Sequence, residues 1–193
     1  MKVIIAGVDE VGRGSLIGPV YAAAVILKKK LDKKKLKDSK KLTKKNREIL
    51  EKYIKKNSYW SIGSASLNEI EKLNILNASL LAMKRAIKKL NRKPSSVLID
   101  GNKTPKIENY NLKSVVKGDE KIPEISAASI IAKVARDRLI RKLSKKFTKY
   151  KWDKNAGYGT KHHLRAIKKF GVTIYHRKTF GPIHNILSPN KIT

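Results

Sequence analysis

The sequence has 193 residues, of which 40% are hydrophobic, and this is enough for one compact unit with an apolar core. Its 46 lysines and arginines outnumber its 15 aspartates and glutamates, and the resulting formal charge of +31 favours nucleic acid as a partner. The lack of cysteine excludes disulfides, thiolate zinc sites and a cysteine nucleophile, and it fits a cytoplasmic location. Lysine runs such as 28–30 also fit a solvated surface, so charge indicates a partner class and not a reaction.

The first predicted element is an apolar run over residues 3–8, which has the pattern of a central strand buried on both faces. The run is far shorter than a membrane span and continues directly into Asp9 and Glu10, unlike a signal peptide, so we expect no membrane association. The predicted strands cover residues 3–8, 20–27, 59–65, 97–100 and 112–116. The predicted helices cover residues 43–56, a short segment from residue 66, a longer one through 76–90, and residues 126–147 and 160–171.

Capping residues support these helices. Thr43 and Thr160 are candidate N-caps, Ser66 and Glu69 match a capping box, and Gly171 ends the last helix. The order of elements predicts an α/β fold with a mixed sheet flanked by helices. We expect a single domain over residues 1–193, with residues from about 148 to 193 forming a small C-terminal helical lobe over the sheet edge.

Four carboxylates, Asp9, Glu10, Asp100 and Asp119, lie at or just after the C-terminal ends of predicted strands. Open α/β sheets gather their ligands at this end. Clustered carboxylates repel one another unless they are protonated or bound to a hard cation, and an all-oxygen site favours magnesium or manganese. Each acid alone could be a turn or helix-cap residue. Their common placement favours a site that holds two ions for phosphodiester hydrolysis.

A glycine-rich segment, Gly12-Arg13-Gly14 with Gly18, follows the first two carboxylates. It faintly resembles a dinucleotide-binding loop, but that motif needs a following helix, whereas Pro19 and a strand-like run come next. The glycines still allow a ligand to approach the backbone closely, so this segment is a candidate contact for a sugar or phosphate.

Six segments in order resemble the type 2 ribonuclease H family and span nearly the whole chain. They are residues 7–14 (GVDEVGRG) with Gly18-Pro19, 38–42 (DSKKL), 98–102 (LIDGN), 117–119 (KGD), 126–137 (SAASI…AKVARD) and 157–160 (GYGT). The resemblance implies a ribonuclease H-like five-stranded mixed sheet and a metal site formed by Asp9, Glu10, Asp100 and Asp119. The carboxylates picked out by their placement are therefore the same four.

The resemblance also implies how substrate is held. The backbone of Gly12, Arg13 and Gly14 would read the ribose 2′-hydroxyl, the group that distinguishes RNA from DNA. Tyr158 would pack against the sugar at the junction with DNA, with plain packing as the alternative role. The residues implied to hold the substrate backbone are Ser39, Lys40 and Lys41, for which ordinary loop positions before a helix are the alternative.

Other polar residues have structural interpretations. His162 and His163 are adjacent on a predicted helix and face different ways, so we expect solvent exposure or substrate contact and no shared metal. Asp137 lies between two arginines within the long helix and is expected to form an ion pair or a buried hydrogen bond. A further segment that matches the family, His176, Arg177 and Phe180, is expected to pack.

The sequence thus predicts a monomeric endonuclease that uses two Mg²⁺ or Mn²⁺ ions. It would hydrolyse the RNA strand of RNA/DNA hybrids and cut 5′ of ribonucleotides embedded in duplex DNA, leaving a 3′-hydroxyl and a 5′-phosphate. The main alternative is a non-catalytic basic nucleic-acid-binding protein, for which the charge alone would suffice. A general RNA or DNA hydrolase on the same architecture is a third possibility.

Overall fold

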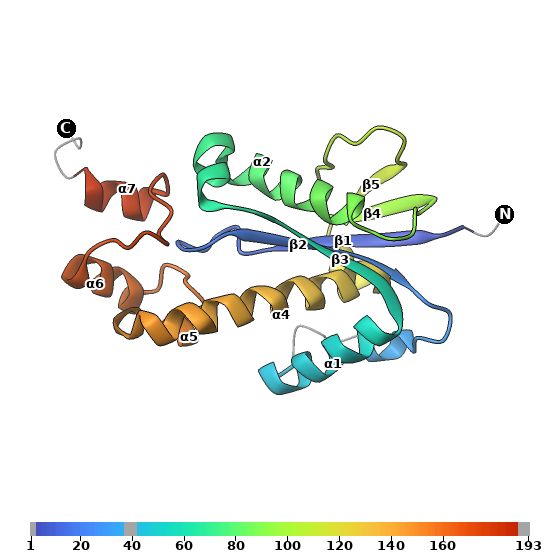
Figure 1. The fold of residues 1–193 in the computed structure, drawn as a ribbon, viewed down its shortest axis with the longest axis horizontal. Coiled ribbons are helices and arrows are strands. Elements are labelled where there is room, and N and C mark those ends of the chain that lie inside the picture. Colours follow the sequence, from blue (N-terminus) through green and yellow to red (C-terminus); the bar gives the residue numbers. More distant parts are fainter. Residues whose placement is uncertain (1–2, 37–41, 189–193) are drawn as a thin grey trace.

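The computed structural model describes residues 3–36 and 42–188 and contains a five-stranded mixed sheet with helices on both faces (Figure 1). The strands, in the spatial order β3-β2-β1-β4-β5, are β1 (Ile5–Val11), β2 (Val20–Leu27), β3 (Ser58–Ala65), β4 (Ser96–Asp100) and β5 (Leu112–Val115). The helices are α1 (Lys44–Lys56), α2 (Leu67–Lys88), α3 (Gly118–Lys121), α4 (Pro123–Lys146), α5 (Trp152–Asn155), α6 (Lys161–Phe170) and α7 (Gly181–Leu187), with 3-10 turns η1 (Lys33–Leu36) and η3 (Thr148–Tyr150). The α/β fold with a mixed five-stranded sheet is confirmed.

The sheet combines two kinds of pairing. β1 runs antiparallel to β2, and β2 runs antiparallel to β3, whereas β1, β4 and β5 are parallel to one another. The parallel strands end on the same side of the sheet, so residues that follow β1 and β4 are brought together. The first strand is central, as predicted, but it continues beyond residue 8 and includes Asp9 and Glu10.

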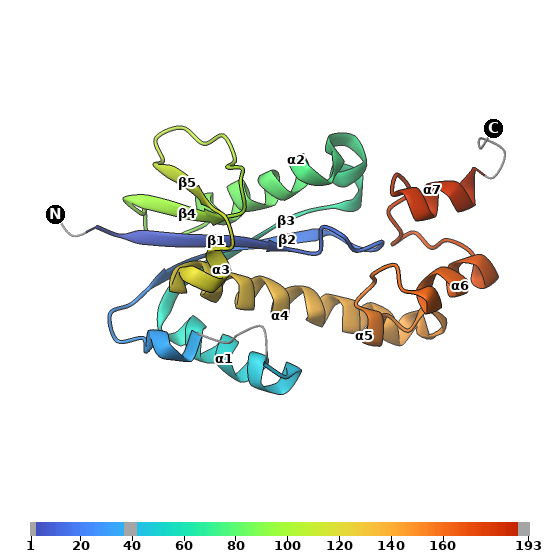
Figure 2. The ribbon, with the colours of Figure 1, turned by 180° about the vertical axis from the view of Figure 1, so that it is seen from behind.

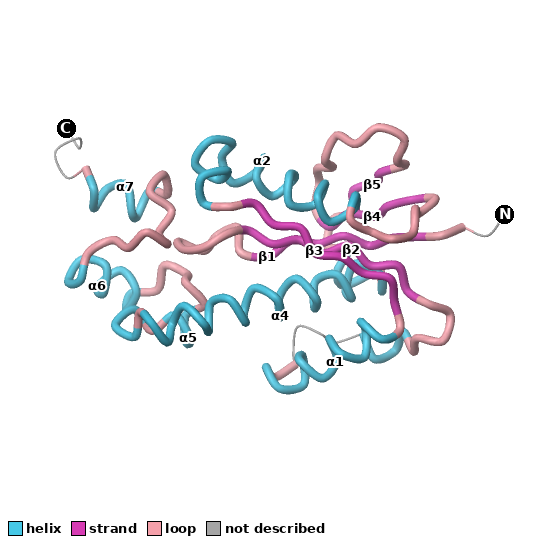
Figure 3. The backbone as a smooth tube through the Cα atoms, viewed as in Figure 1, coloured by secondary structure: helices cyan, strands magenta, loops and turns pink. Residues whose placement is uncertain are grey.

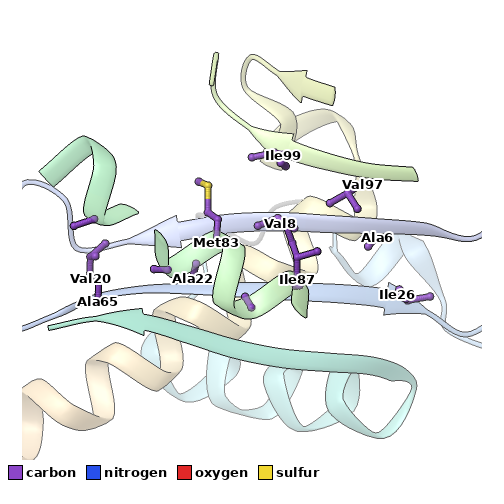
Figure 4. Close-up of a cluster of buried hydrophobic side chains, with 14 of the residues drawn as sticks. Ala6, Val8, Val20, Ala22, Ile26, Ala65, Met83, Ile87, Val97 and Ile99 are labelled. Carbon is purple, nitrogen blue, oxygen red and sulfur yellow. The ribbon is translucent and has the colours of Figure 1, made fainter. Parts of the chain in front are cut away.

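Side chains of β2 alternate between two cores. Ala22 and Ala24 join the cluster that includes α2, and Ala23 and Val25 join the cluster that includes α1 and α4. Burial on both faces explains why the sequence of this strand is apolar throughout. Figure 4 shows the first cluster, in which Met83 and Ile87 of α2 project toward Val8 and the neighbouring strand residues.

Two glycines let the helices approach the sheet closely. A Cβ on Gly7 of β1 would overlap the backbone of Glu124 in α4, and a Cβ on Gly63 of β3 would overlap the carbonyl of Ala82 in α2. α2 and α4 therefore lie almost directly on opposite faces of the sheet, as seen from both sides in Figures 1 and 2. None of the helices in residues 3–36 and 42–188 has the length and apolar character that a membrane crossing requires.

The predicted caps are present. Thr43 accepts a hydrogen bond from the amide of Asn46, and Ser66 and Glu69 form a reciprocal capping box at the start of α2. The predicted short and long helices appear as α2, which is interrupted by a non-helical Asn74 (φ 64°) whose side chain caps the second part. α4 begins three residues earlier than predicted, because Pro123 occupies the first turn, where its missing N–H costs nothing.

Residues 148–188 pack around a third core, which they share with the β1–β2 loop and with Ile140 and Leu143 of α4. Trp152, Ile167 and Ile183 are fully buried in a cluster that also includes Leu16 and Ile17 from the β1–β2 loop. Isolated bridges join Ser15 to Tyr158 and Ile17 to His176 across this contact. The segment thus lies beyond the end of the β1–β2 hairpin (Figure 3) and not over an edge strand, so the expected placement over the sheet edge is wrong.

Candidate active site

Asp9 and Asp100 come together because β1 and β4 are parallel. The register pairs Val8 with Ile99, and an aspartate follows in each strand. Val8 and Ile99 both belong to the core on the α2 side. Because side chains alternate along a strand, both carboxylates project from the α4 face near the C-terminal ends of their strands.

Burial and like charge both act on Asp9, whose exposed fraction is 6%. Its carboxylate accepts hydrogen bonds from the backbone N–H of Glu10, at 2.7 Å, and from the side chain of Ser129 in α4. Burial, together with the negative charges of Glu10 and Asp100, outweighs these bonds and raises the pKa of Asp9 to about 8. A carboxyl group in this environment is stabilised as an anion only when a cation lies beside it.

Glu10 occupies the other face of the sheet. It pairs with Ala22, whose side chain belongs to the α2-side core. Its Oε1 accepts a hydrogen bond from Nη1 of Arg13 at 3.3 Å. Burial raises the pKa of Glu10 in spite of this arginine, and the charge of Asp100 adds to the shift. Glu10 is therefore electrostatically coupled to the pair of aspartates although it does not share their face.

Asp119 is held at the same end of the sheet through the backbone of α3. Oδ1 of Asp100 accepts a hydrogen bond from the N–H of Gly118 at 2.7 Å and a longer one from the N–H of Asp119 at 3.4 Å. A Cβ on Gly118 would lie 3.4 Å from that oxygen and would collide with Ile125. Glycine therefore allows the first turn of α3 to close over the end of β4.

The carboxylates of Asp9, Glu10 and Asp100 interact electrostatically, and the backbone of Asp119 lies beside Asp100, but the four residues form an open arrangement. Among the side chains of residues 3–36 and 42–188, no three acidic, histidine or cysteine groups converge on one metal position. Glu10 faces away from Asp9 and is paired with Arg13, and like-charged carboxylates repel one another. The donor set still fits a hard divalent ion, because every candidate ligand is a carboxylate oxygen and Asp9 is a buried acid that a cation would keep ionised.

The glycine loop and Tyr158 lie together at the same end of β1. Gly12 has a φ of +94°, a conformation that disfavours other residues. Beyond it, Ser15 is bridged to Tyr158, and a Cβ on Gly14 would lie 3.7 Å from the Tyr158 ring. Tyr158 is 39% exposed, so one part of the residue packs on the loop and another faces solvent. The structure thus brings together Gly12, Gly14 and Tyr158, which lie far apart in the sequence. Ser39, Lys40 and Lys41 lie outside the described residues.

The structure confirms the expectations for Asp137 and His162 but not the expectation for His163. Asp137 pairs with Lys133 at 2.7 Å, which confirms its structural role. His162 is exposed, as expected. His163, in contrast, is fully buried, so the expectation of solvent or substrate contact is wrong for it. It lies on the face of α6 that joins the core of residues 148–188, and Trp152 donates a hydrogen bond to its ring at 2.8 Å.

The expected packing role of the segment that ends at Phe180 is confirmed, since His176 and Arg177 are 1% and 0% exposed. Sequence reasoning did not single out Ser129, which contacts Asp9, or Arg136, a fully buried residue of α4. Both lie within the 126–137 segment that carries the family resemblance, and this was the signal that could have found them.

The family model described as ribonuclease HII matches residues 6–182. The chain belongs to the ribonuclease HII family. A relative named ribonuclease HII from Pelagibacter ubique is 73% identical over 184 residues, which cover 95% of this chain and 99% of the relative. A ribonuclease HII from Neisseria meningitidis serogroup B is 49% identical over 97% of each chain.

Solved structures agree with this assignment. The ribonuclease H2 of Pyrococcus horikoshii matches with a TM-score of 0.83 and 26% identity over 97% of this chain and 98% of that one. The ribonuclease HII solved in a complex with PCNA from Archaeoglobus fulgidus matches with a TM-score of 0.75 and 27% identity over 92% and 95%. Bst-RNase HIII in complex with Mn²⁺ shares the fold, with a TM-score of 0.75 at 18% identity, over 98% of this chain and 70% of that one.

As a ribonuclease HII, the chain is an endoribonuclease that degrades RNA in RNA/DNA hybrids. The family depends on divalent metal ions. Family membership also sets aside the alternative of a non-catalytic basic binding protein, because the members are hydrolases. The large positive charge is accordingly that of an enzyme whose substrate is nucleic acid.

Proposed function

We propose that the enzyme cuts on the 5′ side of ribonucleotides, both in RNA/DNA hybrids and at single positions embedded in duplex DNA. The products would carry a 3′-hydroxyl and a 5′-phosphate. The observation that carries the proposal is the position of Asp9 and Asp100 at one end of the sheet, beside a loop that packs against Tyr158.

We propose further that two Mg²⁺ or Mn²⁺ ions are held by Asp9, Glu10, Asp100 and Asp119. When bound, such ions activate a water for attack on the phosphate and stabilise the leaving oxygen. The chain itself fixes the ligands. The Glu10 amide and Ser129 orient Asp9, and the Gly118 amide orients Asp100. For Glu10 to join the set, its ion pair with Arg13 has to open, which leaves the arginine available to the substrate.

Recognition of ribose would come from the loop of Gly12, Arg13 and Gly14 together with Tyr158. Exposed backbone groups in a glycine loop can both donate to and accept from a 2′-hydroxyl, which DNA lacks. The half-exposed ring of Tyr158 offers an apolar surface to the adjoining sugar. Ser39 and Lys40 would hold the substrate backbone and contribute position without sequence preference. We expect the enzyme to act as a single-domain monomer in the cytoplasm.

The test is cleavage of three labelled duplexes that share one sequence: an RNA/DNA hybrid, a DNA duplex with one ribonucleotide, and all-DNA. Each is incubated with Mg²⁺, Mn²⁺ or chelator, and product ends are mapped. The proposal predicts metal-dependent cuts 5′ of the ribonucleotide in the first two duplexes and none in the third. Cleavage of all-DNA, or cuts confined to long hybrids, would contradict it.

A further inference from the structure

Two arginines with no solvent exposure lie directly behind the loop of Gly12, Arg13 and Gly14. Arg136 belongs to α4, and Arg177 follows α6, 41 residues further along the chain. Burying a guanidinium group is costly unless its donors find acceptors. Burial lowers the pKa of both groups, that of Arg177 to about 9, with the nearby charge of Arg136 as a second cause. Two like charges are therefore kept side by side in the interior.

Arg177 forms hydrogen bonds with two carbonyls of the β1–β2 loop. Its Nη1 donates a hydrogen bond to the carbonyl of Arg13 at 2.8 Å, and its Nε donates one to the carbonyl of Gly18 at 2.9 Å. These two carbonyls flank the part of the loop that follows Gly12. The planar, forked geometry of the guanidinium fixes the distance between its two acceptors, so Arg177 sets the shape of the loop.

Arg136 joins the loop to the segment that carries Tyr158. Its two terminal nitrogens donate to the carbonyl of Ala156 at 3.2 and 3.3 Å, and one of them also reaches the carbonyl of Ile17 at 3.4 Å. Its guanidinium carbon lies 5.9 Å from the centre of the Tyr158 ring. A Cβ on Gly12 would collide with its Nε, so Arg136 contacts both recognition elements at once.

These arginines also carry unsatisfied donors. Nε of Arg136 and Nη2 of Arg177 are buried and have no hydrogen-bond partner among the described residues. Such groups cost stability, and a pair of apolar side chains would fill the same space without that cost. Buried residues that carry such a cost point to a role beyond filling the core.

We propose that Arg136 and Arg177 are positioning residues that hold the Gly12–Gly14 loop and Tyr158 in one fixed arrangement for reading the ribose of the RNA strand. The inference rests on the proposed recognition role of these two elements. Neither arginine touches the reacting atoms. They act through the loop carbonyls and through the Ala156–Tyr158 segment, so that ribose and scissile phosphate are aligned with the carboxylates only while both contacts are in place.

The test uses Arg136→Lys and Arg177→Lys, which keep the charge but lose the fork. Arg85→Lys is the matched control, because Arg85 also donates to a backbone carbonyl, that of Ser64, but on α2, away from the loop. For hybrid cleavage, KM and kcat are measured, and kcat is calculated per folded molecule with the folded fraction taken from thermal melts. We expect kcat to fall by about tenfold or more in the first two variants, as a misplaced ribose predicts, and by less than about twofold in the control.

Amide hydrogen exchange supplies a readout that plain packing would not move. In Arg136→Lys and Arg177→Lys, exchange should accelerate in residues 12–18 and 156–158 together, while β3 and α2 stay unchanged. Parental kcat per folded molecule, or unchanged exchange in these two segments, would overturn the proposal. If the lysine variants do not fold, hydrogen exchange in the parent tests the proposal instead. Residues 12–18 and 156–158 should then open as one unit, and independent opening of the two segments would contradict the proposal.

The result for the arginine variants can be distinguished from the result for the proposed cleavage 5′ of ribonucleotides. The cleavage proposal fails if the parent enzyme does not cut 5′ of a single embedded ribonucleotide. The arginine comparison is made on RNA/DNA hybrids, which the family degrades, so it can succeed or fail whatever the result on embedded ribonucleotides.

Discussion

The imidazole rings of His163 and His176 lie in contact in the core of residues 148–188, with their Nε2 atoms 3.3 Å apart. Trp152 Nε1–H donates to Nε2 of His163, and the amide of Thr173 donates to Nδ1 of His176. Nδ1 of His163 is 2.9 Å from the carbonyl of Tyr158. These contacts are satisfied together only if His176 carries its proton on Nε2 and His163 carries its proton on Nδ1, so both rings are neutral.

This pair predicts that the protein loses stability in mild acid. Burial, followed by the charge of His163, lowers the pKa of His176 to about 4, and burial also lowers the pKa of His163. The unfolded chain, with a histidine pKa near 6.5, binds more protons than the folded one between those values, so stability is full above about pH 6.5 and falls as pH drops toward 4. The loss from His176 alone is at most about 3 kcal/mol.

Denaturant unfolding at a series of pH values checks this prediction. The difference between the parent and His176→Gln should shrink between pH 7 and pH 4, because only the parent pays for protonation. His184→Gln, at an exposed histidine of α7, should leave the profile unchanged. A parent and a His176→Gln variant with parallel profiles would contradict the assignment.

Asp9→Asn should abolish cleavage and yet stabilise the metal-free protein. The folded-state pKa of Asp9, raised to about 8 by burial and then by neighbouring carboxylates, means that stability is lost as pH rises from about 4 to 8, because the unfolded chain releases the proton more readily. Asparagine keeps the shape without the charge, and its amide oxygen can still accept the hydrogen bond from the Glu10 N–H. In chelator at pH 8 we expect a gain on the order of a few kcal/mol.

Thermal melts in chelator and in Mg²⁺ give the measurement. Mg²⁺ should raise the melting temperature of the parent and leave that of Asp9→Asn nearly unchanged, because a ligand is missing. Glu71→Gln, at an exposed acid on α2, is the control and should resemble the parent in both solutions. If Asp9→Asn were less stable than the parent in chelator, the charge of Asp9 would not be destabilising in the metal-free protein.

Sequence alone predicted the strands and the caps, because these depend on local chemistry, and the role of the four acids stays a prediction. Thr43, Ser66 and Thr160 cap helices through side-chain contacts within three residues. The burial of His163 depends on contacts with Trp152 and His176, and the hydrogen bond from Arg177 to Gly18 joins segments more than a hundred residues apart. No periodicity carries the information on the Arg177 contact, so it became visible only in the fold, whereas His163 is spaced by three and four residues from the buried Ala166 and Ile167 of its helix.

Gly12→Ala should impair activity more than its effect on stability explains. The residue has a φ of +94°, and any Cβ would press on Nε of Arg136. Backbone strain alone costs about 1 kcal/mol, whereas displacement of Arg136 would also disturb the Tyr158 segment. Gly171→Ala is the control for strain, because Gly171 has a φ of +82° and open space around its Cα.

Gly12→Ala should lose more stability than Gly171→Ala in denaturant unfolding, because only its Cβ displaces Arg136. Per folded molecule, only Gly12→Ala should lose hybrid cleavage, by about tenfold or more, equivalent to ~1.4 kcal/mol. The comparison is made at a temperature at which both variants are fully folded. Equal activity in the two variants would mean that the contact between Gly12 and Arg136 has no bearing on catalysis.

Tyr158 should act through its ring and not through its hydroxyl. The ring lies beside Gly14 and over Arg136, and 39% of the residue is exposed to an incoming substrate. Tyr158→Phe retains this surface, so its kcat/KM on a single-ribonucleotide duplex should stay within about threefold of the parent, a change of less than ~1 kcal/mol. Tyr158→Ala removes the ring and should reduce the same value by tenfold or more, equivalent to ~1.4 kcal/mol.

Phe170 provides the matched control, because it is an aromatic residue of similar exposure, 42%, at the far end of α6. Phe170→Ala should leave cleavage per folded molecule unchanged, since its ring contacts Tyr150 and lies away from the loop of Gly12 and Gly14. A Tyr158→Phe variant as defective as Tyr158→Ala would assign the role to the hydroxyl. The ribose would then be recognised by a hydrogen bond from the tyrosine and not by apolar contact with its ring.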